Sequence, residues 1–315
     1  MKNVINIVFV GLVCLLAGAR ADGQTMLEKR IDSLFVIASS GEVKFQAMVK
    51  PAEDSIAALG ANAVPHLVEK LETKSPRERL AVINILKKIG SPAVPYLVTA
   101  LGFNKGLVVE RVAWALGDIK DTAATNGLLT VAKHPRWQVR EQTIGALGRI
   151  GDARGIDAVA EALDDTIMLV RKAATVAAGQ LKINSAIPRL VHLLGDSFYG
   201  VRMTALAALT EMDSAHTLRS VIDSMGSMNE LVGNLGCSLL GKIRTDSARQ
   251  VLLAQSRAVD PKRRAHAAVA LVLADPTDQT NFRASFLAAE TDRFTRLKVE
   301  SAIASVTNGQ TAESQ

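Results

Sequence analysis

Residues whose types suit catalysis or metal binding are few in this 315-residue chain, and they are widely scattered. Its five histidines are His66, His134, His192, His216 and His266. They form no His-x-x-x-His pair, and the two cysteines lie far apart, so the sequence predicts no metal and no cofactor. Neither a Gly-x-Ser-x-Gly elbow nor a phosphate-binding Gly-Lys-Ser/Thr loop occurs. We therefore expect no catalytic residue and no enzymatic activity.

Two further features are interpreted as structural. Asp164 and Asp165 are adjacent carboxylates, but neighbouring turn residues point apart, and both suit a helix start, where a carboxylate accepts free N–H groups. Cys237 is the single cysteine left if Cys14 is removed with a leader, so no internal disulfide is expected. We interpret Cys237 as a packed thiol, with a reactive or intermolecular thiol as the alternative.

A repeated sequence motif indicates which secondary-structure elements carry the residues named above. It recurs at steps of 31 residues, at Val139-Arg140, Val170-Arg171 and Val201-Arg202. Between two of these dipeptides, residues 156–163 carry apolar side chains at i, i+3, i+4 and i+7, and residues 170–181 carry a second such stripe. Helices this short are unstable alone in water, so each pair must bury its stripes against the next. The predicted fold is all-α, an α-solenoid of stacked antiparallel helix pairs with a 31-residue repeat.

The N-terminus has the features of a secretory leader at residues 1–21. Lys2 precedes an apolar run from Val4 to Leu16, and Ala19-Arg20-Ala21 matches the small-x-small cleavage pattern. We expect cleavage before Asp22 and export to the periplasm or the outside of a bacterial cell, with a retained anchor as the alternative. No other stretch is long and apolar enough for a membrane span, so we expect no membrane insertion after cleavage.

The remaining chain divides into three segments. A helical capping unit is predicted at residues 24–60, in which Pro51 opens the second helix. The repeats cover residues 61–306 in about eight units, and residues 307–315 form a polar tail that we expect to be disordered. The unit at 214–244 carries several glycines, which are costly within helices, so it is expected to be the loosest.

The repeats resemble a known family. The matching residues are Asp165 with Val170-Arg171, Asp196 with Val201-Arg202, Ala-Leu-Gly-x-Ile at 115–119 and 146–150, and Ala-Val-Pro-x-Leu-Val at 63–68 and 93–98. They are similar to HEAT repeats, most closely to the short bacterial form also found in phycobilisome lyase subunits. The resemblance implies that the turn aspartate pairs with the arginine six positions later, within and between repeats. The structural ladder implied in this way consists of Asp165, Arg171, Asp196, Arg202, Arg140 and Arg264.

The same resemblance leaves enzymatic and nucleic-acid-binding alternatives open. Bilin lyases of the HEAT type suggest an accessory subunit or an enzyme, and HEAT-like DNA glycosylases suggest nucleic-acid binding. None of the histidines begins a His-Glu pair, the ligand signature of the HEAT-type iron hydroxylase that modifies a lysine-derived side chain. Removal of Lys2 and Arg20 with the leader leaves 35 basic against 31 acidic residues, a weak indication of nucleic-acid binding.

A binding surface is predicted on the second helices of the units covering 91–151, which line the concave side of HEAT arrays. Its candidate residues are Arg111, Trp114, Gln142 and Arg149. Tryptophan and arginine are enriched at interface hot spots, and Gly145 leaves room beside Trp114. We expect an exported, non-enzymatic scaffold that holds a protein or peptide there, and no nucleic acid. The alternative is that Trp114 fills a packing gap over Gly145.

Overall fold

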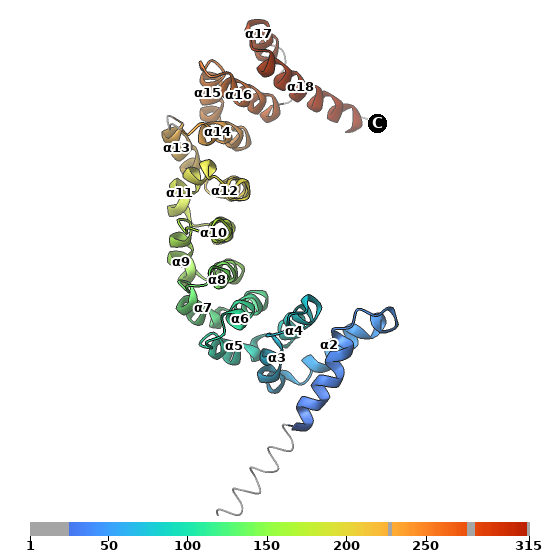
Figure 1. Ribbon diagram of the computed structural model, residues 1–315. Coiled ribbons are helices and arrows are strands. Elements are labelled where there is room, and N and C mark those ends of the chain that lie inside the picture. Colours follow the sequence, from blue (N-terminus) through green and yellow to red (C-terminus); the bar gives the residue numbers. More distant parts are fainter. Residues whose placement is uncertain (1–24, 226–228, 276–280, 314–315) are drawn as a thin grey trace, which may run out of the picture. The chain divides into compact units, whose positions relative to one another are not determined.

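The computed structural model describes residues 25–225, 229–275 and 281–313, and its regular elements in these ranges are helices and 3-10 turns (Figure 1). The predicted leader at residues 1–21 lies outside the described residues. Among the helices that are described, none combines the length and apolar character that a membrane span requires. Contacts between residues divide the chain into two units, Met1–Gly155 and Ile156–Gln315.

The first unit begins with the predicted capping segment. Residues 25–38 are helical, and the 3-10 turn η1 (Val43–Phe45) leads into α2 (Gln46–Ala57). Pro51 lies inside α2 and not at its start, so that detail of the prediction is wrong. A proline inside a helix leaves the carbonyl four residues earlier without its N–H partner. Here that carbonyl belongs to the exposed Ala47, where water can satisfy it.

Helix pairs follow the capping segment in the first unit. They are α3 (Val64–Lys70) with α4 (Pro76–Ile89), α5 (Val94–Ala100) with α6 (Gly106–Ile119), and α7 (Thr125–Val131) with α8 (Trp137–Ile150). The 3-10 turns η2 (Gly60–Ala63), η3 (Ser91–Ala93), η4 (Thr122–Ala124) and η5 (Ala153–Gly155) lie at the ends of the pairs. Each second helix of this unit packs on its own first helix, and α6 also packs on both α4 and α8. The apolar stripes are thereby buried, and Leu67, Leu86 and Leu116 are fully enclosed.

The second unit repeats this arrangement. Its pairs are α9 (Ile156–Ala162) with α10 (Met168–Gln180), α11 (Ile187–His192) with α12 (Tyr199–Glu211), α13 (Ser214–Ser224) with α14 (Glu230–Ile243), α15 (Asp246–Gln255) with α16 (Pro261–Ala274), and α17 (Asn281–Ala289) with α18 (Arg293–Glu313). The 3-10 turns η6 (Asn184–Ala186) and η7 (Leu193–Gly195) flank α11. Helices α10, α12, α14, α16 and α18 pack in sequence order. The predicted all-α, solenoid-like fold is confirmed.

One local expectation differs from the structure. Helix α18 continues to Glu313, through most of the segment expected to be a disordered tail. That the glycine-rich unit is the loosest stays a prediction, and residues 226–228 of this unit lie outside the described residues. Helix α14 is continuous from Glu230 to Ile243. Its glycines allow close packing: a Cβ at Gly233 would overlap the guanidinium of Arg263, and a Cβ at Gly241 would lie 3.0 Å from the Cβ of Ala270.

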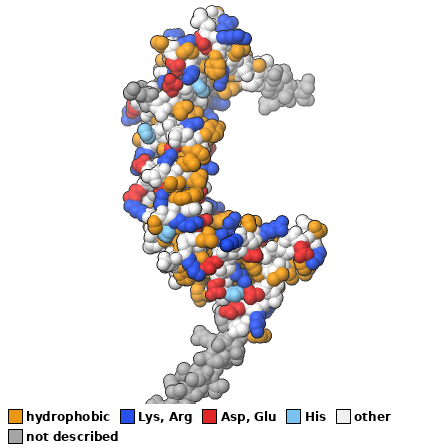
Figure 2. Space-filling model, in the orientation of Figure 1, with side chains coloured by type: hydrophobic (Ala, Val, Ile, Leu, Met, Phe, Trp, Pro, Cys, Tyr) orange, Lys and Arg blue, Asp and Glu red, His pale blue; other side chains and the backbone are white. Residues whose placement is uncertain are grey.

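Charged side chains cover the surface without separating by sign. On the face shown in Figure 2, Lys and Arg are interspersed with Asp and Glu, and small hydrophobic patches lie between them. A continuous basic track, as nucleic-acid binding requires, is therefore not visible on that face.

Candidate functional site

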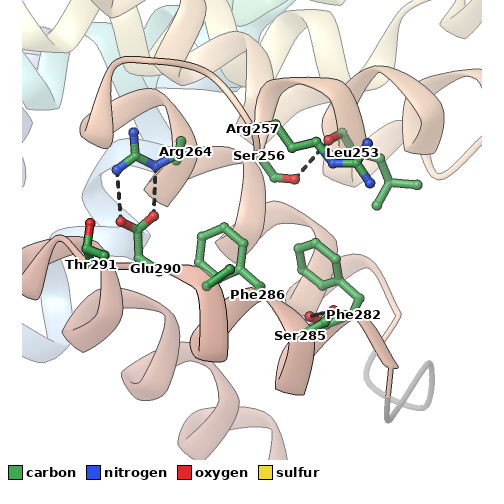
Figure 3. A pocket seen from close by; sticks show the side chains of 10 residues that line it. Leu253, Ser256, Arg257, Arg264, Phe282, Ser285, Phe286, Glu290 and Thr291 are labelled. Carbon is green, nitrogen blue, oxygen red and sulfur yellow. Dashed lines mark hydrogen bonds and ion pairs between the residues drawn. The ribbon is translucent and has the colours of Figure 1, made fainter.

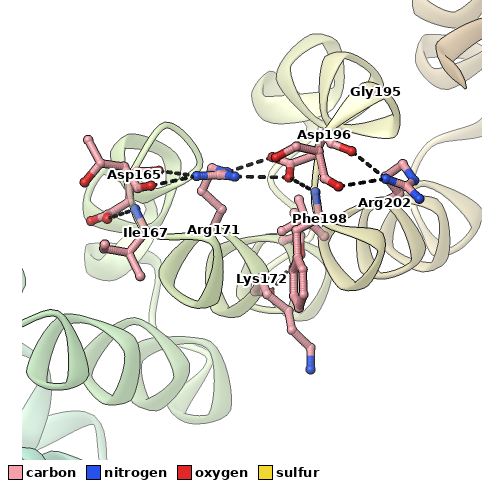
Figure 4. Close-up of polar contacts among 12 residues, drawn as sticks. Asp165, Ile167, Arg171, Lys172, Gly195, Asp196, Phe198 and Arg202 are labelled. Atoms are coloured by element: carbon pink, nitrogen blue, oxygen red, sulfur yellow. Dashed lines mark hydrogen bonds and ion pairs between the residues drawn. The ribbon is translucent and has the colours of Figure 1, made fainter. Parts of the chain in front are cut away.

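Arginines at the start of the second helices tie the turns of the second unit together. Arg171 donates from Nε and Nη2 to the two carboxylate oxygens of Asp196, at 2.7 and 3.0 Å (Figure 4). Its Nη1 donates to the carbonyl of Asp165 at 2.8 Å. Arg202 repeats the second contact, donating from Nη1 to the carbonyl of Asp196 at 2.7 Å. Each arginine therefore holds the carbonyls of its own turn, and Arg171 also holds the carboxylate of the next turn.

The other two arginines of the ladder follow the same geometry. Arg264 donates from Nε and Nη2 to Glu290 at 2.7 and 2.8 Å, so a glutamate stands where Arg171 finds an aspartate. Arg140 donates from Nη1 to the carbonyl of His134 at 2.9 Å. Within a repeat the turn carboxylate serves another purpose, because Asp165 accepts the N–H of Ile167. Within a repeat whose turn holds an aspartate, the arginine therefore bonds to the backbone carbonyl of that aspartate and not to its carboxylate. Between repeats, Arg171 bonds to the carboxylate of Asp196.

In the first unit, two of the candidate binding residues come together. Trp114 donates from Nε1 to Asp118 at 3.0 Å, and Nε of Arg149 lies 3.4 Å from the same carboxylate. The guanidinium of Arg149 lies against Gly117 and Gly145, where a Cβ would collide with it or press on it. Burial lowers the pKa of Arg149, and the charge of Asp118 opposes that shift. Arg149 therefore fills the space beside Trp114 that Gly145 leaves.

The other two candidates lie elsewhere. Arg111 is only 5% exposed and donates to the carbonyls of Leu71 and Thr73, and burial lowers the pKa of its guanidinium. Gln142 lies half-buried on α8. Arg79, which is not among the predicted binding residues, lies with its Cζ 5.9 Å from the centre of the Trp114 ring. The aromatic face of Trp114 is therefore covered by an arginine of the chain itself.

A groove in the first unit was not predicted from the sequence. It has a volume of about 650 Å³ and lies where α3 and α5 approach the loop before α6. Tyr96 and Phe103, each 47% exposed, form aromatic walls, and Glu69 and Glu72 stand at its edge. Lys105 forms an ion pair with Glu72. Glu69 therefore gives the groove an excess of one negative charge.

A histidine lies beside this groove and is held by two carboxylates. Nε2 of His66 is 2.8 Å from Asp32, and Nδ1 is 3.6 Å from Glu69, which lines the groove. Lys70 also contacts Asp32, and Lys70 together with His66 holds the pKa of that carboxyl below its ordinary value. Asp32 thus contacts one ring nitrogen of His66, and the other ring nitrogen faces Glu69 at a distance longer than a hydrogen bond. Sequence reasoning missed this arrangement because Asp32 and His66 are 34 residues apart, on different helices.

Short antiparallel helix pairs stacked through arginine-tied turns define the class of α-solenoid repeat proteins. HEAT repeats match residues 64–134 and 125–210, and the chain is therefore a HEAT-repeat protein, as the sequence resemblance indicated. The narrower likeness to phycobilisome lyase subunits is not shown by this match.

Similar proteins include an enzyme. The chain is 34% identical over 116 residues to deoxyhypusine hydroxylase-B of Oryza sativa subsp. japonica, a match that covers 35% of this chain and 38% of the rice protein. Among solved structures, it is similar to the YibA protein of Escherichia coli, at 18% identity, over 81% of this chain and 96% of that one, with a TM-score of 0.50. Human deoxyhypusine hydroxylase matches at 19% identity over 80% of this chain and 98% of that one, with a TM-score of 0.36.

The expectation of a non-enzymatic scaffold is wrong by these comparisons. The similarity to deoxyhypusine hydroxylase points to an enzyme. The expectation rested on the lack of short catalytic motifs, which are recognised by their spacing along the chain. A site assembled from side chains on separate helices, such as Asp32 and His66, produces no such motif.

The residues of this chain do not fit the iron centre that the resemblance to the hydroxylase implies. In the described ranges no three His, Cys, Asp or Glu side chains are grouped closely enough to hold a metal. At His66 the two carboxylates contact opposite ring nitrogens, so the three groups do not converge on one point. Cys237 is fully buried, and burial raises the pKa of its thiol to about 12, so it stays protonated and is a poor ligand.

Proposed function

We propose that this chain is an enzyme that modifies a cationic, aliphatic side chain of a protein substrate, and that the side chain lies in the groove between α3 and α5. The observation that carries the proposal is the 34% identity to a deoxyhypusine hydroxylase over 116 residues. That relative is named for acting on deoxyhypusine, an amine-bearing side chain derived from lysine. The match spans 38% of the relative, so the activity is transferred here as a proposal and not as a finding.

The groove has the chemistry that such a side chain needs. Tyr96 and Phe103 offer apolar and aromatic surface to the methylene stem, and aromatic faces also attract ammonium groups. The carboxylate of Glu69 is 79% exposed at the edge and supplies the counter-charge. Lys105 neutralises Glu72 and leaves Glu69 as the acidic group for the substrate.

Proton transfer is the chemistry that the neighbouring residues supply. His66 contacts Asp32 through Nε2, and its Nδ1 lies 3.6 Å from Glu69, so a proton passes between the imidazole and Glu69 through one bridging water. No step in this proposal passes through a metal, because the described residues do not fit one. The leader predicted at residues 1–21 would place the reaction outside the cytoplasm.

The test uses the full chain with two protein substrates that differ in one side chain, deoxyhypusine or unmodified lysine. We expect the purified chain to bind the deoxyhypusine form. When molecular oxygen and an electron donor are supplied, the intact mass of that substrate should rise by one oxygen atom, the second oxygen atom leaving as water. Glu69→Gln should weaken binding, because it removes the counter-charge. His66→Asn should abolish the mass change and leave binding nearly unaltered.

The control is His216→Asn, which removes an exposed histidine of α13 whose imidazole contacts the surface carboxylate of Asp213. This variant should bind and react like the original chain. An unchanged mass with both substrates would contradict the enzymatic proposal. Binding that is insensitive to Glu69→Gln would contradict the assignment of the groove.

A further inference from the structure

A second pocket lies wholly within the second unit, where α15, α16 and α17 meet (Figure 3). Its volume of about 520 Å³ is in the range of small-molecule sites. Leu253 and Arg257 line it from the end of α15, and Phe282 and Phe286 line it from α17. The proposed function uses none of these residues.

One wall of the pocket is electrically neutral. Arg264 and Glu290 are joined by two hydrogen bonds of 2.7 and 2.8 Å, and Nη1 of Arg264 donates to the carbonyls of Ala258 and Val259. The hydrogen bonds to Glu290 raise the pKa of Arg264, and the same bonds lower the pKa of Glu290. Both groups are thus fully engaged with each other and with the backbone, so neither is available to a ligand.

Arg257 supplies the net charge of the pocket. Its side chain is exposed at the end of α15, and no ion pair joins it to any residue in the described ranges. Among the charged residues that line the pocket, Arg264 and Glu290 cancel, so the guanidinium of Arg257 leaves an excess of one positive charge. A guanidinium presents two parallel N–H donors, which match the two oxygens of a carboxylate.

The wall opposite this charge is aromatic. The Phe282 and Phe286 rings lie with their centres 5.6 Å apart and their planes inclined by 33°, and both are half-buried. Figure 3 shows the two rings side by side below Arg257 and Leu253. Ser285 is turned to the backbone, since its hydroxyl donates to the carbonyl of Phe282. This wall therefore offers apolar surface of about the size of a ring.

We propose that this pocket binds a small carboxylate with a ring-sized apolar body. The carboxylate pairs with Arg257, and the ring packs on Phe282 and Phe286. A single negative charge matches the single unpaired guanidinium, whereas a phosphate dianion would lack a second donor group and would lie near Glu290. The site is independent of the groove beside Glu69, which lies in the other unit.

Calorimetric titration of the full chain tests this proposal with two probes of equal shape, 3-phenylpropanoate and its uncharged amide. We expect the acid to bind at least roughly tenfold more tightly than the amide, because a hydrogen bond to a charged group contributes about that factor. Arg257→Gln should remove the preference for the acid. Phe286→Leu, which keeps an apolar side chain of moderate size, should weaken both probes.

Arg219→Gln is the matched control, because Arg219 is an exposed arginine of α13 in the same unit and does not line the pocket. It should leave both affinities unchanged. Equal affinity for acid and amide, no binding of either probe at millimolar concentration, or a preference that survives Arg257→Gln would each overturn the proposal. The outcome is separable from the proposed enzymatic function, since the His66 and Glu69 variants leave this pocket intact.

Discussion

Arg79 in the first unit and Arg171 in the second occupy the same position of the repeat, yet they have different partners. Arg171 holds the carboxylate of Asp196 and the carbonyl of Asp165. Arg79 lies on the ring of Trp114, and its Nε is buried without a hydrogen-bond partner. The same position of the repeat carries an arginine in both units, but the neighbouring residues determine which groups that arginine contacts.

Two differences in their surroundings explain why Arg79 and Arg171 have different partners. Arg171 holds the carbonyl six positions before it, and the equivalent carbonyl for Arg79 is that of Thr73, which accepts from Arg111 instead. The next turn offers Asn104 at the place where the second unit has Asp196. Arg79 therefore lacks both the carbonyl and the carboxylate, and it turns to the aromatic ring. A ladder arginine therefore ties two turns together only when its own turn offers a free carbonyl and the next turn supplies a carboxylate.

The largest effect should come from truncating these two arginines in parallel. Arg171→Ala leaves the carboxylate of Asp196, only 5% exposed, without its partner, and breaking such a pair costs roughly 3–5 kcal/mol of unfolding free energy. Arg79→Ala removes a cation–π contact and should cost about 1 kcal/mol. Urea denaturation of both variants measures the difference. Equal losses would show that the two arginines are equivalent and that the comparison is wrong.

Acid should lower the stability of the second unit by protonating the carboxylates of Asp196 and Glu290. Burial alone would raise the pKa of Asp196, but Arg171 and the N–H of Phe198 outweigh it, and the pKa is lowered from 3.8. Arg264 is the main cause that lowers the pKa of Glu290 from 4.5. A lowered folded-state pKa gives stability that is present above the unfolded value and lost as pH falls through the folded one.

We therefore expect the melting temperature to change little through these two groups above about pH 5 and to fall as the pH is lowered further. Arg171→Ala should reduce the part of this acid dependence that belongs to Asp196, whereas Arg79→Ala should leave it unchanged. Thermal unfolding by circular dichroism between pH 3 and 7 measures both. The same acid dependence in all three proteins would argue against a role of the ladder.

A smaller effect tests how the first unit holds Arg149. A Cβ at Gly117 would lie 2.7 Å from the Cα of Ala146 and would collide with the guanidinium of Arg149. Gly117→Ala should therefore cost roughly 1–3 kcal/mol through overpacking. A Cβ at Gly145 would meet only Nη1 of Arg149, at 3.3 Å, so Gly145→Ala should be neutral or should gain up to about 1 kcal/mol of helix propensity. Thermal unfolding of the Gly117→Ala and Gly145→Ala variants shows whether the close packing at these glycines holds Arg149 in place.

The smallest effect on either unit should come from removal of the leader. Cleavage before Asp22 leaves every described helix intact, so the unfolding curve should not change. Mass spectrometry of the native protein should find Asp22, or a neighbouring residue, at its N-terminus. An intact Met1 on a cytoplasmic protein would contradict the predicted export, whereas an intact Met1 on an exported protein would indicate the retained anchor.

The sequence alone determined the repeat. Apolar spacing, the 31-residue step and the Val-Arg dipeptides are local properties, and they predicted the stacked helix pairs because short helices can bury their stripes only against similar neighbours. The ladder geometry at Arg171 and Asp196 also follows from register, because equivalent positions in adjacent repeats come to lie side by side. The sequence did not predict that Pro51 lies inside α2, where the carbonyl that it leaves without an N–H partner belongs to the exposed Ala47. It also did not predict that α18 extends to Glu313.

Only the tertiary structure decided which residues meet outside that register. It joined Asp32 to His66 across two helices, turned Arg111 back to the turn at Leu71, and laid Arg79 on Trp114. Those contacts depend on side-chain reach and on the space left by glycines and neighbouring helices, and no spacing in the sequence encodes them. For that reason the periodic pattern predicted the fold, whereas the groove and the pocket beside Arg257 required the packed structure.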